Sequence, residues 1–381
     1  MEWKEDLLGN LIDALIDYRG KTPKKQSFGI PLITAKIIKN GSISEPTEFI
    51  SEDQYHLWMT RGFPVNGDVI LTTEAPLGEV AQLDFRKVAL AQRVVCFRGK
   101  KNMIDNTYLK YYFLSYYGQQ ALRARETGTT VTGIKQSELK KVIVKYPSFL
   151  FQRKIAGILS ALDSKIENNN KINANLEAQA EALFKSWFVD FTPFKDQPFV
   201  DSELGPIPQG WKVGKLGDIC TFKRGKNLLS KNAIDEGVPV VAGGLSPSCY
   251  HNQANTSAPV VTVSGSGANA GFMRMYHVDV WASDCSFIDV SCDYLYFVYC
   301  FLSVNRRLLK HAQTGAVQPH VKPADIHDFD VVIPEEDIVK AFQSIIKELL
   351  TKVGVNEKEN QRLAALRDTL LPKLMSGEIK L

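Results

Sequence analysis

Short apolar runs separated by glycine and proline make up most of the chain, and two long stretches depart from this pattern. β-Branched and aromatic runs at 69–71, 94–97 and 260–263 lie between Gly and Pro signals, which is typical of strands. Aromatic segments at 108–117 and 294–304 predict helices. Further strands are predicted at 142–146 and 329–333, each followed by a proline. The pattern therefore indicates α+β domains built from short elements.

The two long stretches have helical periodicity. Between 151 and 190 the only Gly or Pro is Gly157, and apolar residues recur at steps of four and three, with the same spacing 187 positions later. Heptad spacing of this kind predicts two long helices, over 151–190 and 335–377. The repeated positions are Leu162, Ile166, Asn169, Asn173, Leu176, Ala180, Leu183 and Trp187, and then Leu349, Val353, Asn356, Asn360, Leu363, Arg367, Leu370 and Leu374.

Asparagines interrupt the middle of both apolar series, Asn169 and Asn173 in the first and Asn356 and Asn360 in the second. A buried Asn at a core position can specify register and strand number at a cost in stability. If the helices pack antiparallel, the four amides meet in one polar layer. The alternative is that they lie on a hydrated face, and their recurrence in both series favours the register role.

The rest of the chain is also duplicated. "TGTTVTGIKQSELKKVIVKYP" (127–147) matches "TGAVQPHVKPADIHDFDVVIP" (314–334) at an offset of 187, pairing Gly128 with Gly315 and Pro147 with Pro334. Near the front of each copy, Gly9 of "LGNLIDALIDYRGK" matches Gly217 of "LGDICTFKRGK". Internal repeats of this extent indicate a tandem duplication. Between the copies, 191–210 holds four prolines and predicts an extended linker.

Composition and charge narrow the class of protein. The chain has 381 residues, enough for two domains, with 44% apolar residues and a net charge of +4. Residues 1–150 carry 21 Lys/Arg against 16 Asp/Glu, whereas 201–334 carry 11 against 12, which argues against strong DNA affinity by this chain alone. The absence of a long apolar run, of a signal-like start and of paired cysteine spacings predicts a cytoplasmic protein with reduced thiols.

Motifs for catalysis are weak. "RGKT" (19–22) has Leu15 where a phosphate-binding loop needs glycine, and "SGSGANAG" (264–271) places its third glycine one residue late for GxGxxG. The six histidines lack metal-ligand spacing, the chain has no Pro-Pro pair of the kind found in amino-methyltransferase motifs, and no serine or cysteine has a nucleophile context. The sequence therefore predicts a recognition protein without catalytic or metal-binding residues.

Several basic and polar loops are candidates for DNA contact. Lys and Arg neutralise phosphates, and Arg can donate two hydrogen bonds to guanine. For each residue the alternative is a solvated loop, and the glycines between them are interpreted as structural. The predicted DNA-binding residues are Arg19, Lys21, Thr22, Lys24, Lys25, Thr73, Thr129, Thr130 and Lys135 in the first copy and Lys223, Arg224, Lys226, Ser264, Ser266, Gln318, His320 and Lys322 in the second.

Taken together, these features resemble the specificity subunits of type I restriction–modification systems. The resemblance covers essentially the whole chain. It depends on the LGD…RGK and GW…LGD openings, the TG…P blocks ending at Pro147 and Pro334, and the paired stretches "LSALDSKIENNNKINANLEAQAEALFKSWF" and "LLTKVGVNEKENQRLAALRDTLLPKLMSGEI". In the second copy, Ala316 and Val317 replace Thr129 and Thr130, so the resemblance does not support a shared contact there.

The resemblance implies a pseudo-twofold α+β fold with two tandem mixed α/β target-recognition domains joined by two long antiparallel helices that form a coiled-coil spacer. The expected boundaries are 1–150 and 211–334 for the domains, 151–190 and 335–377 for the helices, and 191–210 for the linker. Each domain is expected to read half of a split site in double-stranded DNA. The helices are expected to set the half-site spacing and to dock two modification (methyltransferase) subunits, with restriction (motor-nuclease) subunits completing the complex. S-adenosylmethionine, ATP and Mg²⁺ are expected on those partners and not on this chain.

Two other functions stay open at this point. The chain could be the recognition half of a split modification methyltransferase, although the missing motifs argue against it, and binding of S-adenosylmethionine by the lone chain would discriminate. It could also be a coiled-coil scaffold that binds only protein. Retention of a bipartite duplex, but not of scrambled DNA, by the assembled complex would exclude that function.

Overall fold

The computed structural model describes residues 2–17, 22–84, 87–128, 132–314 and 319–381. The chain divides into two compact units. Unit 1 comprises residues 1–167 and 360–381, and unit 2 comprises 168–359. Each unit therefore contains the beginning of one long helix and the end of the other. The predicted boundaries at 150 and 334 separate the helices from the recognition domains, whereas each compact unit includes a part of both helices.

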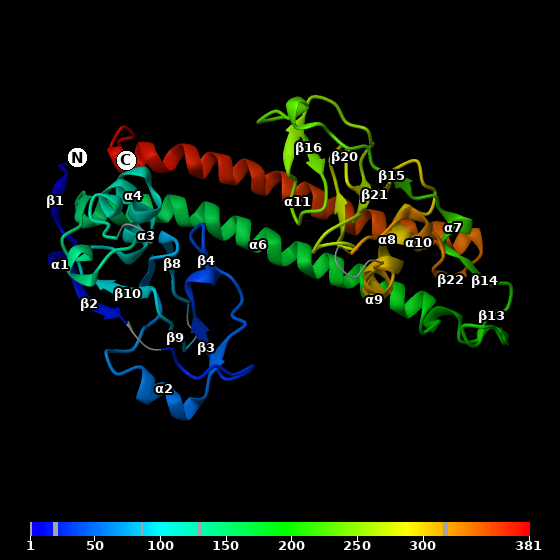
Figure 1. Ribbon diagram of the computed structural model, residues 1–381, viewed down its shortest axis with the longest axis horizontal. Helices are drawn as coiled ribbons and strands as arrows, with labels where there is room; N and C mark the ends of the chain where they lie inside the picture. The colour runs from blue at the N-terminus through cyan, green and yellow to red at the C-terminus, as the bar shows by residue number, and fades with distance from the viewer. Residues whose placement is uncertain (1, 18–21, 85–86, 129–131, 315–318) are drawn as a thin grey trace. The chain divides into compact units, whose positions relative to one another are not determined.

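Unit 1 combines a four-stranded sheet, in the order β2-β10-β7-β8, with a three-stranded β6-β3-β9 sheet and a β1-β11 pair (Figure 1). Its strands are β1 (Lys4–Leu7), β2 (Ile12–Asp17), β3 (Ile30–Ile33), β4 (Ile38–Lys39), β5 (Ser42–Ile43), β6 (Phe49–Ile50), β7 (Val69–Thr73), β8 (Leu77–Gln82), β9 (Ala89–Leu90), β10 (Val94–Gly99) and β11 (Ile143–Tyr146). Its short helices are α1 (Leu8–Leu11), η1 (Ala35–Ile37), α2 (Glu52–Trp58), α3 (Asn106–Leu114), α4 (Tyr116–Arg123) and α5 (Gln136–Leu139).

Unit 2 repeats this topology. Its sheets run β15-β21-β18-β19, β17-β16-β20 and β14-β22, and the third strand of the three-stranded sheet is parallel in both units. Its strands are β12 (Phe199–Val200), β13 (Ile207–Pro208), β14 (Lys212–Lys215), β15 (Lys223–Arg224), β16 (Val238–Val241), β17 (Cys249–His251), β18 (Val260–Ser264), β19 (Met273–Tyr276), β20 (Trp281–Ala282), β21 (Cys285–Ile288) and β22 (Asp330–Ile333). Its short helices are η2 (Thr192–Phe194), α7 (Leu216–Ile219), η3 (Ser230–Asn232), α8 (Leu295–Val304), α9 (Arg306–His311) and α10 (Pro323–His327).

The opening glycine of each copy occupies the same tight position. A Cβ atom on Gly9 would lie 3.1 Å from the Lys140 Cβ, and one on Gly217 would lie 2.9 Å from the His327 Cβ. Lys140 and His327 are 187 positions apart, which is the offset found in the sequence. The repeated LG dipeptide therefore lets α1 or α7 approach the segment before the last strand of its unit.

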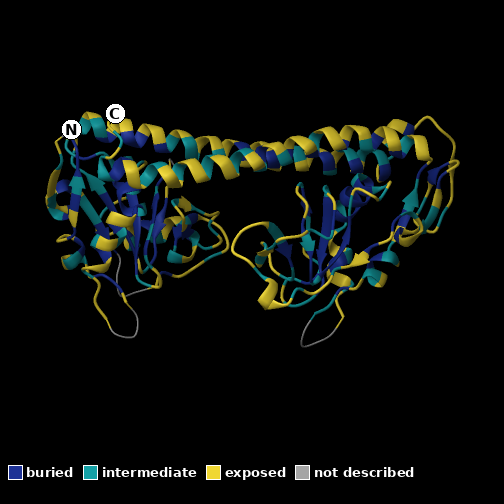
Figure 2. Cartoon of the chain, turned by 90° about the horizontal axis from the view of Figure 1, so that it is seen from above, coloured by how far each residue is buried: buried dark blue, intermediate teal, exposed yellow. Residues whose placement is uncertain are grey.

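The long helices are α6 (Phe149–Phe188) and α11 (Glu336–Ser376), which begin 187 residues apart. Each lies within two residues of its predicted limits. In unit 2 they run antiparallel, because Asn169 contacts Glu359 whereas Asn173, further along α6, contacts Val353 and Asn356. Figure 2 shows buried residues along one side of each helix and exposed residues along the other. This division is expected for a heptad pattern.

Aromatic side chains fill the core of unit 2 where α6 ends. Phe184 and Phe188 pack on Phe297 and Phe342, with ring centroids 4.8–5.9 Å apart. Trp211, which begins the second copy, is 5% exposed and packs against the ring of Phe188 in a tilted arrangement. Burial of large rings is the main source of stability in such a core. The end of the first helix is thus part of the core of the second domain.

The segment predicted as an extended linker, 191–210, is more ordered than expected. It contains the 3₁₀ helix η2 and a two-stranded ladder in which Phe199 pairs with Pro208. Phe194 is buried and its ring contacts Trp211 at 5.0 Å. The prolines predict an extended segment, but a phenylalanine between them, Phe194, packs against the core of unit 2. Within the part of the chain that the structure describes, no helix is long and apolar enough to span a membrane.

Candidate nucleic-acid interface

The RGKT loop of unit 1 lies partly within the described residues. Arg19 and Lys21 fall outside them. Thr22 is exposed, and its hydroxyl accepts a hydrogen bond from the Gln92 amide at 2.8 Å. Lys24 is exposed, and the Lys25 ammonium lies 2.9 Å from the Glu48 carboxylate. The described part of this loop therefore presents cations to solvent, one of them already paired.

The two predicted loops before α5 and α10 have the same backbone pairing. Thr127 pairs with Gly133 and Thr314 with His320 in isolated antiparallel bridges. Thr129, Thr130 and Gln318, predicted to contact DNA, lie outside the described residues. His320 is half-buried, whereas Lys135 and Lys322 are exposed at the first turns of α5 and α10. The ends of both loops thus place a lysine at the surface beside the sheet.

Three hydroxyl candidates are less accessible than predicted. Thr73 and Ser264 are 2% and 3% exposed, because both end central strands of the four-stranded sheets. Their side chains are enclosed by the sheets and are not displayed at the surface, and DNA contact by these two residues stays a prediction. Ser266 is half-buried, and its hydroxyl donates to the Asp284 carboxylate. The accessibility of Thr73 and Ser264 is lower than the sequence predicts, because a short apolar run does not reveal that a strand is buried on both faces of its sheet.

The RGK loop of unit 2 is presented to solvent. Lys223, Arg224 and Lys226 are all exposed, and Arg224 donates a 2.7 Å hydrogen bond from Nη2 to Asp284 Oδ1. Gly225 lies directly against the β20–β21 turn, since a Cβ there would be 2.1 Å from the Ser283 carbonyl oxygen. Glycine is therefore required for the loop to approach the sheet. This approach brings Arg224 to Asp284, a residue that the sequence pattern did not single out.

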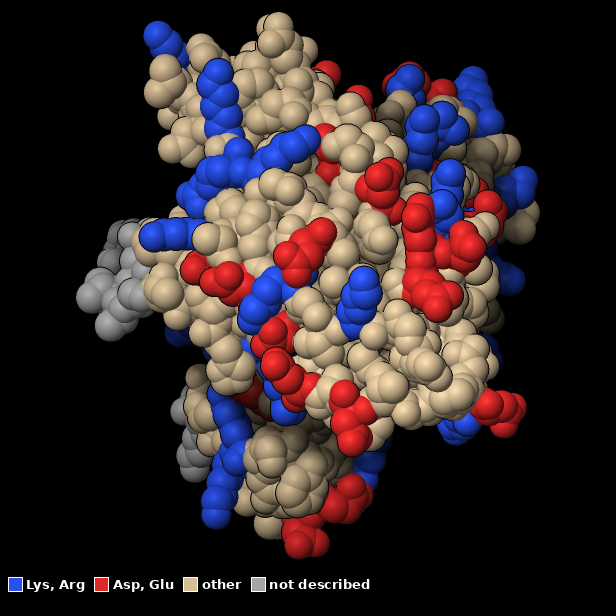
Figure 3. Space-filling model, turned by 90° about the vertical axis from the view of Figure 1, so that its right-hand side faces the viewer, with Lys and Arg blue, Asp and Glu red and all other residues tan. Residues whose placement is uncertain are grey.

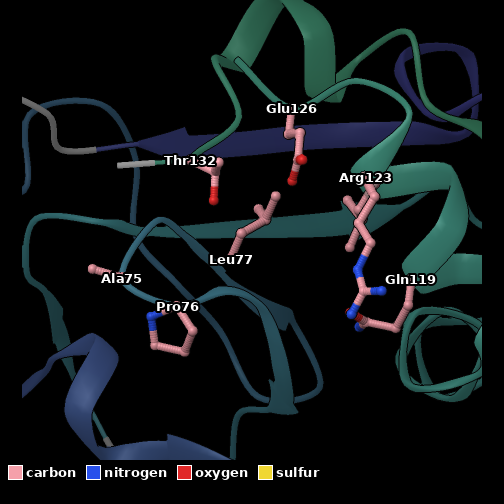
Figure 4. Close-up of a pocket in the computed structure, with 8 residues that line it drawn as sticks. Ala75, Pro76, Leu77, Gln119, Arg123, Glu126 and Thr132 are labelled. Carbon is pink, nitrogen blue, oxygen red and sulfur yellow. The ribbon is translucent and has the colours of Figure 1, made fainter. Parts of the chain in front are cut away.

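Two pockets flank the turn after β7, and Ala75 lines both. One, of about 420 Å³, is drawn in Figure 4, where Glu126 and Thr132 point into it and the Arg123 side chain lies beside Gln119. The Gln119 amide already donates to the carbonyl oxygens of Gly78 and Phe113. The other pocket, of about 260 Å³, has cationic side chains in its lining. These cations are Lys25, Lys36 and Arg93, of which the sequence predicted only Lys25 as a DNA-binding residue.

Charge is mixed on the face of the molecule that Figure 3 draws. Figure 3 shows one face on which acidic and basic side chains are interspersed. Mixed charge provides weaker phosphate attraction than a continuous basic face. Among the described residues, no cluster of three His, Cys, Asp or Glu side chains is arranged to hold a metal ion.

The asparagines predicted to set helix register are mostly buried. Asn169, Asn173 and Asn356 are 1%, 9% and 1% exposed, and Asn360 is half-buried. The Asn356 amide donates to Asn173 Oδ1 at 2.7 Å, and the Asn169 amide donates to Glu359 Oε2 at 2.8 Å. The hydrated-face alternative is therefore wrong for the three buried residues. Their polar atoms find partners across the two helices, as buried amides must.

Known proteins are similar to this chain in sequence and in fold. The family model of the type I restriction modification DNA specificity domain matches residues 2–178 and 208–367. The type I restriction enzyme MjaIX specificity subunit of Methanocaldococcus jannaschii is 32% identical over 398 residues, covering 95% of this chain and 90% of that protein. The HindI specificity subunit of Haemophilus influenzae is 24% identical, covering 67% and 73%. The crystal structure of an S subunit from M. genitalium matches with a TM-score of 0.63 and 18% identity, covering 98% and 96%.

The family model matches twice, and each match begins near the start of one sequence copy and runs into the long helix that follows it. Two matches to one domain model agree with the two units of common topology. The chain belongs to the family of type I restriction–modification DNA specificity subunits.

Proposed function

We propose that this chain supplies DNA sequence specificity to a type I restriction–modification complex. Each unit reads one half of a bipartite site in double-stranded DNA. The single observation that carries this proposal is the repeated topology. The two four-stranded sheets have the same strand order, and their corresponding strand-end positions hold Glu74 and Arg93 in one unit and Ser266 and Asp284 in the other. A constant fold with variable edge residues is what two readers of different half-sites require, because sequence is read through side chains at base edges.

The partners follow from the family. The chain itself is non-catalytic and acts in the cytoplasm. It docks two modification (methyltransferase) subunits and, through the assembled complex, restriction (motor-nuclease) subunits. S-adenosylmethionine, ATP and Mg²⁺ bind to those partners. The mixed charge on the face drawn in Figure 3 supports this division, since partner subunits can add phosphate contacts to those that the lysines of this chain make.

The two long helices set the spacing between the half-sites, and the buried asparagines specify their register. An amide pair across the helices supports this role, since sliding one helix along the other separates Asn356 from Asn173 and leaves buried polar groups unsatisfied. Inserting four residues into one helix is expected to change the preferred spacing or abolish activity. An unchanged spacing would contradict the proposed role of the helices.

The direct test is methylome sequencing of a host that expresses this chain with its modification subunits, compared with a host lacking only this chain. The expected result is a new split motif with methylated adenine on both strands. If the complex assembles and no new motif appears, the chain is either a scaffold that binds only protein or an inactive allele. If the lone chain binds S-adenosylmethionine, it is part of a split methyltransferase.

A further inference from the structure

Two polar positions just beyond the ends of the central strands of the four-stranded sheet correspond in the two units. The β7–β10 ladder pairs Thr72 with Val94, and the β18–β21 ladder pairs Ser264 with Cys285. Counting from these pairs, Glu74 corresponds to Ser266 and Arg93 to Asp284. Isolated bridges confirm the first correspondence, because Glu74 pairs with Gly133 and Ser266 pairs with His320, which is 187 positions after Gly133.

In both units these two positions contact each other, but with different chemistry. In unit 1 the Arg93 Nε lies 2.9 Å from Glu74 Oε1. In unit 2 the Ser266 hydroxyl donates to the Asp284 carboxylate, which also accepts a 2.7 Å hydrogen bond from Arg224. Each unit thus holds one guanidinium against one carboxylate at the same end of its sheet. The guanidinium comes from the β9–β10 turn in unit 1 and from β15 in unit 2.

Both guanidinium groups remain accessible. The side chains of Arg93 and Arg224 are 52% and 46% exposed. In unit 2 the pair lies over Gly265, where a Cβ would be 3.0 Å from Asp284 Oδ1 and 3.2 Å from Arg224 Nη1. An exposed ion pair adds little to stability, so stability alone does not account for the same arrangement arising in two different ways. An arginine held by one carboxylate has fewer rotamers to lose when it binds a planar ligand.

The surroundings of each pair suit a DNA backbone. Arg93 lines the 260 Å³ pocket together with Thr22, Lys25, Lys36 and Gln92. Lys223 and Lys226, the neighbours of Arg224 in the RGK loop, are exposed. Lys322 is also exposed, and it follows Val321, whose backbone N–H donates to the Gly265 carbonyl oxygen. Flexible lysines neutralise phosphates without reading sequence, whereas a fixed guanidinium matches the O6 and N7 acceptors of guanine. Each unit combines both kinds of group at one sheet end.

We propose that Arg93 and Arg224 each read a guanine in the major groove, one in each half-site, and that Glu74 and Asp284 are positioning residues for them. This inference rests on the proposed function, since it names the residues and the base through which each unit reads DNA. Because the arginine projects from a different strand or turn in each unit, the guanine falls at a different place in each half-site. One fold thereby reads two sequences.

The test uses the full complex of this chain with its modification subunits. The variants are Arg93→Lys and Arg224→Lys, which keep the charge and remove the planar fork. Binding is measured on duplexes that carry each of the four bases at every position of the motif, and methylomes are sequenced in parallel. Arg93→Lys is expected to reduce discrimination at one guanine of one half-site by about tenfold to a hundredfold. Arg224→Lys is expected to do the same in the other half-site only.

Controls separate base reading from structure. Arg306→Lys changes another exposed arginine of unit 2, which lies 3.0 Å from Glu181, and is expected to leave the motif unchanged. Glu74→Gln is expected to relax the same position as Arg93→Lys but to a smaller extent, and Glu74→Asp is expected to restore part of the preference. A purely structural carboxylate would instead alter affinity for all duplexes equally.

The results test the proposed function and the role of the two arginines separately. If the wild-type complex shows no split motif, the proposed function fails. If the wild type shows one and Arg93→Lys and Arg224→Lys leave every base preference intact, only the role of the arginines is overturned. A loss of affinity that is equal for all bases would also overturn it, because it indicates a phosphate contact. If a variant no longer methylates DNA in cells, binding of its purified complex to the panel of duplexes still measures its base preference.

Discussion

The Asn356 side chain donates a 2.7 Å hydrogen bond to Asn173 Oδ1, and both amides are buried between α6 and α11. Asn173 also donates to the Val353 carbonyl oxygen at 3.4 Å. Buried amides in a helix seam cost stability relative to apolar residues, but they favour one register. This contact therefore links a local sequence signal to the alignment of two helices whose sequences lie far apart.

The first prediction concerns this pair. Asn356→Leu removes the donor and leaves Asn173 Oδ1 buried without it, so we expect a loss of about 1–3 kcal/mol in the free energy of unfolding. The double variant Asn173→Leu/Asn356→Leu is expected to recover most of this loss. Chemical unfolding of the four proteins of the cycle measures the coupling. Additive losses would show that the two amides do not depend on each other.

A second prediction concerns Asp163, which joins α6 to α3 and α11 within unit 1. It accepts hydrogen bonds from Tyr111 at 2.6 Å and Arg367 at 2.8 Å, and Lys110 lies 3.3 Å away. Burial by itself would raise the pKa of the Asp163 carboxyl, but these partners more than offset it and hold the pKa below its usual value of 3.8.

Because the pKa of Asp163 is lower in the folded chain, its stabilising contribution is present above pH 3.8 and is lost as the pH falls toward the folded pKa. Asp163→Asn is expected to reduce the free energy of unfolding by about 2 kcal/mol at pH 7. Thermal melts at pH 7 and in acid check this, with Glu348→Gln, an exposed carboxylate on α11, as control. Equal destabilisation by the two variants would contradict it.

The third prediction concerns His277, whose side chain packs on Gly354 of α11 within unit 2. Burial, together with the charge of Arg274, lowers the pKa of His277 from 6.5 to about 4. The unfolded chain therefore binds a proton more readily between these values. The contribution of the neutral His277 to the free energy of unfolding is therefore full above pH 6.5. It is lost as the pH falls toward 4, by up to about 3 kcal/mol.

Replacing His277 by Gln is expected to flatten this pH dependence. The free energy of unfolding of the wild type and of His277→Gln, measured at pH 5, 6 and 7, checks the expectation. His311→Gln, at the end of the exposed turn of α9, is the matched control and should retain the wild-type slope. Parallel slopes for all three proteins would show that His277 does not titrate differently on folding.

The fourth prediction compares two tryptophans that open the two copies. Trp211 is 5% exposed and packs against Phe188 and Phe194, whereas Trp3 is half-buried against Gly377 and the Lys145 ammonium. Trp211→Ala is expected to cost about 3–5 kcal/mol, and Trp3→Ala less. Hydrogen exchange should then increase in residues 184–188 for the first variant and 370–376 for the second. The reverse assignment would contradict the packing.

The fifth prediction concerns phosphate contact by the described part of the RGKT loop. Lys24→Ala is expected to weaken DNA binding by the assembled complex. It is also expected to reduce the slope of log K against the logarithm of the salt concentration by about one. Lys358→Ala, on the exposed surface of α11, serves as control and should have a smaller effect. Equal losses for the two variants would count against the loop as a DNA contact.

The sequence by itself determined the duplication, the element types and the two helix seams. These depend on local periodicity, because side chains repeat every two residues in a strand and every 3.6 in a helix. The offset of 187 survives in the structure from the Gly9–Lys140 and Gly217–His327 contacts to the starts of α6 and α11. Local pattern was sufficient because each of these elements has the same partners in both copies.

Only the tertiary structure decided which residues meet. The sequence matched Arg224 with Arg19, but the ladders place Arg224 opposite Ser286 and Asp17 opposite Val95, so Arg224 occupies the strand position of Asp17. The Arg93–Glu74 contact and the burial of Thr73 and Ser264 depend likewise on how strands distant in sequence are aligned. Strand register is a non-local property, set when side chains from several strands pack on both faces of one sheet, and no single run of residues encodes it.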